Sequence, residues 1–135
     1  MTISGNDVLK GGFGNDVLTG GASGDILTGG AGADKFVFHE GNSDLDERDQ
    51  ITDFSAEDVI DLSMLDIHGA SSPAGASEAY RFVTSDSTQA GTVWAVGKYA
   101  DWTVFVNTDG GAPDMAIHVT LTGGLQSLTA ADFLL

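Results

Sequence analysis

The residues of this chain that could most readily do chemistry are aspartates that recur at a fixed interval. Each lies nine residues after the last, at Asp7, Asp16, Asp25 and Asp34. Two positions after each aspartate comes a large apolar residue: Leu9, Leu18, Leu27 and Phe36. Carboxylates brought close together repel one another unless a cation lies between them. The spacing therefore predicts cation binding, provided that the fold brings the aspartates together.

Glycines precede these aspartates in a nonapeptide pattern, G-G-x-G-x-D-x-U-x, where U is a large apolar residue. Residues 11–19 and 29–37 match it throughout, and residues 20–28 depart from it only at Ser23. Residues 5–10 are the second half of a repeat whose first half has lost its glycines, so we expect the chain to begin part-way into a longer array. The candidate metal ligands of the repeats, through side chains or main-chain carbonyls, are Gly5, Asp7, Gly11, Gly12, Phe13, Gly14, Asp16, Gly20, Gly21, Ala22, Ser23, Asp25, Gly29, Gly30, Ala31, Gly32 and Asp34.

The repeat predicts an all-β fold. Paired glycines permit a tight turn with positive φ, and the x-U-x tail is a short strand with one inward apolar side chain. Nine residues then make half a coil, and two repeats close one turn of a parallel β-roll. Stacked coils would bring Asp7 near Asp25 on one edge and Asp16 near Asp34 on the other.

Calcium is the ion that this arrangement favours. Glycine turns expose main-chain carbonyls, and Ca²⁺ prefers carbonyl and carboxylate oxygens, whereas Mg²⁺ gives up its water reluctantly. A flexible glycine-rich linker is the alternative. The strict period and the apolar residue in phase with each aspartate argue against it.

After the repeats, the chain shows ordinary strand signals separated by turns. They lie at residues 50–54, 59–62, 80–84, 92–96, 102–106 and 115–121, and we expect an antiparallel β cap that covers the open end of the roll. The expected organisation is thus repeats over 1–38 and a capping region over 39–135, together one domain. Asn107, Asp109 and Asp114 could form another calcium loop, although a plain hairpin turn is favoured.

Composition narrows the possible partners and functions. The chain has 135 residues with a net charge of -15, and residues 1–66 hold 14 of its 20 acidic residues. Such acidity disfavours nucleic acid as a partner. There is no cysteine, no apolar run long enough for a membrane span and no classical signal peptide. No catalytic motif is present: the histidines are far apart and form no His-Glu-x-x-His zinc motif, so we expect no enzyme activity.

The repeats resemble the RTX nonapeptide. Together with the segments 49–54 and 59–63, they resemble the C-terminal domain of serralysin-type metalloproteases and related type I secreted proteins. The resemblance implies that Asp44 and Asp49 complete calcium sites against the last repeat loops, with a weaker case for Asp53. The ending Asp132-Phe133-Leu134-Leu135 resembles the C-terminal motif of proteins exported by ABC transporters of type I secretion.

Two functions are compatible with these features. The first is an extracellular module of a larger secreted protein, which folds on Ca²⁺ outside the cell and carries the type I secretion signal. The second is a polysaccharide-binding module similar to the R-modules of mannuronan epimerases. The aromatic residues Trp94, Tyr99 and Trp102 could form a carbohydrate platform, although packing is their more common use. The five basic residues are too scattered in the sequence to indicate a track for a polyanion.

Overall fold

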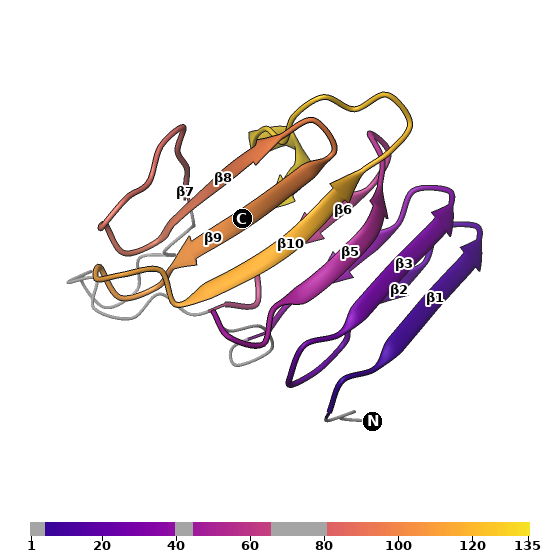
Figure 1. Ribbon diagram of the computed structural model, residues 1–135, viewed down its shortest axis with the longest axis horizontal. Helices are drawn as coiled ribbons and strands as arrows, with labels where there is room; N and C mark the ends of the chain where they lie inside the picture. The colour runs from indigo at the N-terminus through magenta and orange to yellow at the C-terminus, as the bar shows by residue number, and fades with distance from the viewer. Residues whose placement is uncertain (1–4, 40–44, 66–80) are drawn as a thin grey trace.

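Two β-sheets enclose a shared apolar core in the computed structural model, which describes residues 5–39, 45–65 and 81–135. The larger sheet, in spatial order, contains β1 (Val8–Phe13), β3 (Ile26–Ala31), β5 (Asp49–Phe54), β10 (Met115–Leu121), β9 (Asp101–Asn107), β8 (Thr92–Lys98) and β7 (Arg81–Phe82). The smaller sheet contains β11 (Phe133–Leu134), β6 (Val59–Asp61), β4 (Lys35–Val37) and β2 (Val17–Leu18). Figure 1 shows the larger sheet in front, with β2 and β6 behind it.

The N-terminal part of the chain is a parallel β-roll. Successive strands alternate between the sheets, so that Val8 of β1 pairs with Ile26 of β3, and Val17 of β2 pairs with Lys35 of β4. Both pairings are offset by 18 residues, which is two nonapeptides. The predicted β-roll is therefore confirmed.

The next two strands differ from the expectation. β5 and β6 were expected in an antiparallel cap, yet they pair in parallel with β3 and β4 and continue the roll. Leu27 faces Ile51 and Phe36 faces Ile60, so the offset grows from 18 to 24 residues while the inward apolar positions stay in phase. Burial of these side chains explains why the roll tolerates a longer connection here.

The antiparallel part begins with β10. β10 pairs in parallel with β5 and antiparallel with β9, and β9 pairs antiparallel with β8. A short 3-10 helix, η1 (Ala130–Asp132), leads into β11, which lies parallel to β6 and completes the smaller sheet. The core between the sheets joins both parts, from Leu18, Leu27, Phe36, Ile51 and Ile60 in the roll to Val93, Val104, Ile117, Val119 and Phe133 beyond it.

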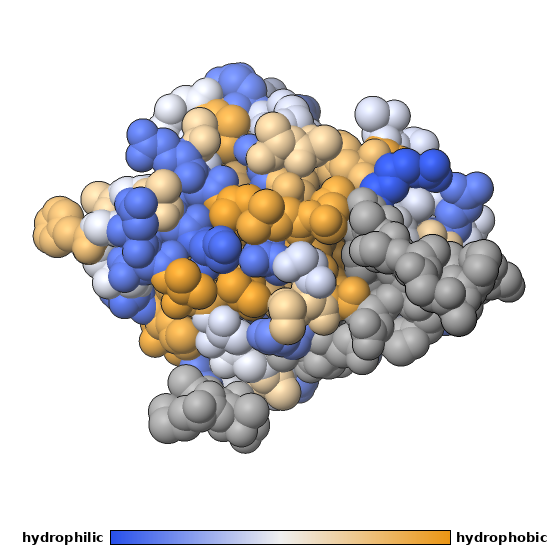
Figure 2. Space-filling model, turned by 180° about the vertical axis from the view of Figure 1, so that it is seen from behind, coloured by the Kyte–Doolittle hydropathy of each residue, from blue (hydrophilic) through white to orange (hydrophobic). Residues whose placement is uncertain are grey.

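The outer face of the smaller sheet carries some apolar surface. Val17 is 69% exposed and Leu134 is 42% exposed, while their neighbours Leu18 and Phe133 point into the core. The view from behind shows hydrophobic residues gathered in the middle of this side (Figure 2).

Within the described ranges, no helix has the length and apolar character needed to cross a membrane.

Candidate metal centre

The aspartates of successive coils form two ladders, one along each edge of the roll. In the Asp7 ladder, the N–H of Asp7 donates to Oδ1 of Asp25 at 2.8 Å, and the N–H of Asp25 donates to Oδ1 of Asp49 at 2.7 Å. In the Asp16 ladder, the N–H of Asp16 donates to Oδ1 of Asp34 at 2.8 Å, and the N–H of Asp34 donates to Oδ1 of Asp58 at 2.9 Å. Coil stacking thus brings together the aspartates that the nine-residue period singled out.

In the aspartates of the repeats, the second carboxylate oxygen, Oδ2, is buried and has no hydrogen-bond partner among the described residues. This holds for Oδ2 of Asp7, Asp16, Asp25 and Asp34. A buried charged oxygen without compensation is costly, and neighbouring carboxylates add to that cost. These atoms are therefore placed where a bound cation would compensate them.

The first glycine of each turn makes room for this oxygen. A Cβ on Gly11 would lie 2.7 Å from Oδ2 of Asp16, and a Cβ on Gly20 or Gly29 would clash with Oδ2 of Asp25 or Asp34. None of these three glycines has a positive φ, so at these positions glycine is required by space rather than by backbone conformation.

The later glycines of each turn are required for close stacking. Gly30 and Gly32 have positive φ, and a Cβ on either would clash with the carbonyl oxygen of Gly12 or Gly14 in the preceding coil. Gly5, Gly12, Gly14 and Gly21 also have positive φ. Ser23, which replaces a glycine of the pattern, takes the same left-handed conformation with φ of 83°. The turns thus keep one geometry despite this substitution.

Main-chain oxygens must supply much of any coordination shell. Among the described residues, no three His, Cys, Asp or Glu side chains gather where they could hold a metal ion. A hard dication that accepts carbonyl oxygens beside a carboxylate matches this donor set, and Ca²⁺ is such an ion. The carbonyls of Ala22 and Ala31 already accept hydrogen bonds from Gly5 and Gly14 of the preceding coil, at 3.2 and 2.8 Å. Phe13 could contribute only its main-chain carbonyl, because a phenyl ring has no oxygen ligand to offer; the residue is 95% exposed.

Asp49 and Asp58, the last residues of the two ladders, have raised pKa values. Burial raises the pKa of Asp49 to about 7; the N–H of Asp25 opposes that shift and the Asp25 carboxylate adds to it. Burial likewise raises the pKa of Asp58, against hydrogen bonds from Asp34 and Ser55. The Asp49 carboxylate would be easier to ionise beside a cation.

Other predicted ligands fall outside this arrangement. Asp44 lies outside the described residues. Asp53 belongs to neither ladder, because its carboxylate accepts hydrogen bonds from the N–H groups of Gly29 and Gly30. Asn107, Asp109 and Asp114 form the β9–β10 hairpin turn: their side-chain oxygens accept from Gly110, Gly111 and Thr108. These bonds explain the three residues as turn formers.

Asp58 is the ladder residue that the sequence analysis missed. It lies nine residues after Asp49, and Ile60 follows two positions later, as Ile51 follows Asp49. The aspartate and apolar phases therefore continue beyond the glycine turns. Extending the period without requiring glycines would have identified Asp58.

The repeats match a known family model, the RTX calcium-binding nonapeptide repeat, with 4 copies over residues 2–36. Residues 2–36 are RTX calcium-binding nonapeptide repeats. The prediction of calcium as their ion is confirmed by this match. No curated protein matches the chain.

Solved structures share the fold. One is the solution structure of the AlgE6R3 subunit from the Azotobacter vinelandii mannuronan C5-epimerase. It is 23% identical in sequence with a TM-score of 0.56, and the alignment covers 97% of this chain and 72% of that chain. The similarity extends the common fold through the region that follows the RTX repeats.

Proposed function

We propose that this chain is a non-catalytic module of a larger secreted protein, whose RTX roll folds when it binds calcium outside the cell. The observation that carries the proposal is the pair of stacked ladders, with four buried Oδ2 atoms that lack a hydrogen-bond partner in the described structure. Without a cation, these carboxylates oppose the stacking of coils. With calcium, the same atoms become ligands that join each coil to the next.

The calcium concentration at which the module should fold follows from this role. Extracellular calcium-binding modules have dissociation constants of about 10⁻⁴ to 10⁻³ M. At cytosolic calcium levels the repeats would then be largely empty, and the net charge of -15 would favour an expanded chain. An unfolded chain suits passage through a transporter, and folding outside the cell would favour outward movement.

The direct test is far-UV circular dichroism of the full chain during a Ca²⁺ titration from EDTA, with Mg²⁺ in parallel. We expect a cooperative gain of β structure with Ca²⁺ and none with Mg²⁺ at the same concentration. Identical spectra and melting curves in EDTA and in Ca²⁺ would refute calcium-dependent folding.

We also propose that the ending 132–135 acts as the type I secretion signal. In the folded chain Asp132 is the last residue of η1, and Phe133 and Leu134 form β11. Oδ2 of Asp132 accepts from the N–H of Thr129 at 2.6 Å, and the ring of Phe133 stacks on that of Phe82 at 5.3 Å. Export requires a transporter to bind this segment before it becomes part of the smaller sheet. The secretion signal would therefore be accessible only in the unfolded chain.

Export can be tested in bacteria that produce an ABC transporter of type I secretion. Alanine at all four positions 132–135 should abolish the appearance of the chain in the medium. Asp109→Ala, in an exposed turn, serves as the control. Denaturing immunoblots of medium and cells make the readout independent of folding. Equal export of the two variants would remove 132–135 as the signal.

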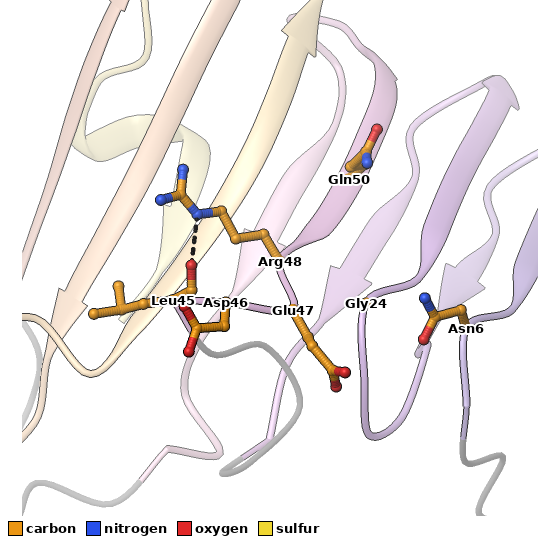
Figure 3. A pocket seen from close by; sticks show the side chains of 7 residues that line it. All are labelled: Asn6, Gly24, Leu45, Asp46, Glu47, Arg48 and Gln50. Atoms are coloured by element: carbon orange, nitrogen blue, oxygen red, sulfur yellow. Dashed lines mark hydrogen bonds between the residues drawn. The ribbon is translucent and has the colours of Figure 1, made fainter.

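A polysaccharide-binding role is the second candidate. The observation that favours it is an open cavity of about 470 Å³ beside the Asp7 ladder, which Figure 3 shows with its lining residues Asn6, Gly24, Leu45, Asp46, Glu47, Arg48 and Gln50. Its polar side chains suit a sugar, although Asp46 and Glu47 would repel a polyanion. Calorimetric titration with alginate and with a neutral glucan tests this candidate; micromolar affinity for either would support it, and no heat with both would exclude it.

A further inference from the structure

The third turn of the Asp16 edge, residues 53–58, differs chemically from the two glycine turns above it. It contains no glycine: its sequence is Asp-Phe-Ser-Ala-Glu-Asp. Asp58 nevertheless accepts the N–H of Asp34 through Oδ1, as Asp34 accepts the N–H of Asp16. The turn therefore keeps its place in the ladder while losing the glycine pattern.

Both carboxylate oxygens of Asp58 accept a backbone N–H. Its Oδ1 accepts from Asp34 at 2.9 Å, and its Oδ2 accepts from the N–H of Ser55 at 2.7 Å. By contrast, Oδ2 of Asp16 and of Asp34 is buried with no partner among the described residues. In the earlier turns Oδ2 is left for a cation, whereas Oδ2 of Asp58 accepts a backbone N–H of its own turn.

Asp53 engages the turn above it in the same way. The N–H of Gly29 donates to its Oδ1 at 2.9 Å, and the N–H of Gly30 donates to its Oδ2 at 2.8 Å. One coil earlier, the equivalent glycine is Gly11, and the group next to it from the following coil is the carbonyl of Gly29. A side-chain carboxylate therefore closes the stack of glycine turns where another glycine turn would otherwise follow.

Two main-chain oxygens of this turn, those of Asp53 and Phe54, also accept hydrogen bonds. Thr122 donates its hydroxyl to the carbonyl of Asp53 at 2.9 Å and its N–H to the carbonyl of Phe54 at 2.8 Å. Phe54 itself is fully buried in the core. The carbonyls that occupy the first two positions of a glycine turn here bond to the segment that follows β10.

We propose that Asp53 and Asp58 end the calcium array on the Asp16 edge, so that the turn of residues 53–58 joins the turn of residues 29–34 without an ion. Protein N–H and O–H donors bond to both carboxylates and to the carbonyls of Asp53 and Phe54. The proposal rests on calcium binding by the earlier turns, and it makes Asp53 and Asp58 positioning residues rather than ligands. Their role is to join the calcium-binding coils to the part of the chain that follows them.

Calcium counting on the full chain separates ligands from positioning residues. Native mass spectrometry and equilibrium dialysis would be applied to the wild-type chain and to Asp53→Asn, Asp58→Asn and Asp34→Asn. We expect Asp34→Asn to lose about one ion, because a carboxylate ligand is removed. Asp53→Asn and Asp58→Asn should keep the wild-type ion count and lower the melting temperature in saturating calcium by about 5 °C, since each loses a charge-assisted hydrogen bond.

A matched control is Glu57→Gln, which removes one exposed charge from the same turn. It should change neither the ion count nor the melting temperature appreciably. Loss of an ion from Asp53→Asn or Asp58→Asn, but not from Glu57→Gln, would overturn the proposal. A wild-type chain that binds no calcium would instead refute the proposed function, so the two failures are distinguishable.

Calcium anomalous scattering from crystals of the wild-type chain gives a test that depends on no variant. We expect a peak near Oδ2 of Asp34, between the turns 11–16 and 29–34. We expect no peak within the calcium–oxygen distance of about 2.3–2.6 Å from any oxygen of Asp53 or Asp58. A peak bound to either residue would overturn the proposal.

Discussion

Asp16 and Asp34 are linked across one turn of the roll, because the N–H of Asp16 donates to Oδ1 of Asp34 at 2.8 Å while Oδ2 of Asp34 is buried and has no hydrogen-bond partner in the described structure. One carboxylate therefore both fixes the register of two coils and offers an oxygen to a cation. Calcium binding and coil stacking are coupled through this single side chain.

Replacement of Asp34 should separate these two roles. Asn can still accept the N–H of Asp16 through its amide oxygen, but it lacks the charge that binds calcium. Interactions with a charged group contribute about 1.5–3 kcal/mol, so we expect the calcium midpoint of folding to rise about ten- to a hundredfold in Asp34→Asn. A calcium titration followed by circular dichroism measures the shift. The exposed Asp86, changed to Asn, is the control, and equal midpoints for both variants would contradict the role of Asp34.

Ser23 offers a gain in stability. Its φ of 83° lies in the left-handed region, where a non-glycine residue costs about 1 kcal/mol or more. Ser23→Gly should remove this strain and restore the nonapeptide pattern, raising the stability in calcium by about 0.5–1 kcal/mol.

The neighbouring Ala22 provides a control, because its φ is not positive. Ala22→Gly should lower the stability, since it only adds freedom to the unfolded chain. Urea unfolding at fixed calcium compares the two variants. A destabilised Ser23→Gly would show that the serine side chain makes a contribution larger than the strain.

Gly20 should be intolerant of even one methyl group. A Cβ there would clash with Oδ2 of Asp25, although the φ of Gly20 is not positive. Gly20→Ala must displace the carboxylate, so we expect weaker calcium binding by about tenfold. Gly111→Ala, in the β9–β10 turn, meets Oδ1 of Asp109 only at 3.3 Å and serves as the comparison. Calcium titrations of equal midpoint would argue against a tight fit at Gly20.

The pH dependence of thermal stability should have opposite signs in the calcium-free and the calcium-loaded chain. Burial raises the pKa of Asp49 to about 7, above the ordinary value of 3.8, so the folded chain binds this proton more tightly than the unfolded chain. In EDTA, the stability that protonation contributes is fully present below the unfolded value and is lost as pH rises through about 7. We therefore expect any folded structure in EDTA to melt at higher temperature at pH 5 than at pH 8.

In calcium the order should be opposite, because protons compete with the ion for the carboxylates. Thermal melts at both pH values, with and without EDTA, measure the reversal. Asp49→Asn should reduce the slope in EDTA. A slope in EDTA that is flat, or that rises with pH, would show that Asp49 is not held protonated in the folded chain.

The sequence predicted the roll because its signals are local and periodic. The glycine turns, the aspartates and Leu27 or Phe36 recur every nine residues, so the coil and the ladders follow from spacing. The parallel pairing of β5 and β6 was not predicted, since a longer connection changes the offset to 24 residues and the turns there lose their glycines. Burial of Ile51 and Ile60 decides that pairing, and only the three-dimensional structure shows it.

The site was predictable to the same extent. Stacking of Asp7 on Asp25 and of Asp16 on Asp34 follows from the period, whereas the place of Asp53 depends on contacts with Gly29, Gly30 and Thr122, which are distant in sequence. Trp94 illustrates the same limit: its stacking on Phe105 at 5.6 Å places it in packing rather than on a free platform, and only cross-strand register determines this.

The measurement that tests the central claim most directly is residue-resolved amide hydrogen exchange of the full chain in EDTA and in saturating Ca²⁺. The amides to follow are those of Asp7, Asp16 and Asp25, which donate to the ladder carboxylates. If calcium holds the coils together, these amides are strongly protected in Ca²⁺ and exchange at close to the unfolded rate in EDTA. Equal protection in both conditions would contradict calcium-dependent folding of the roll.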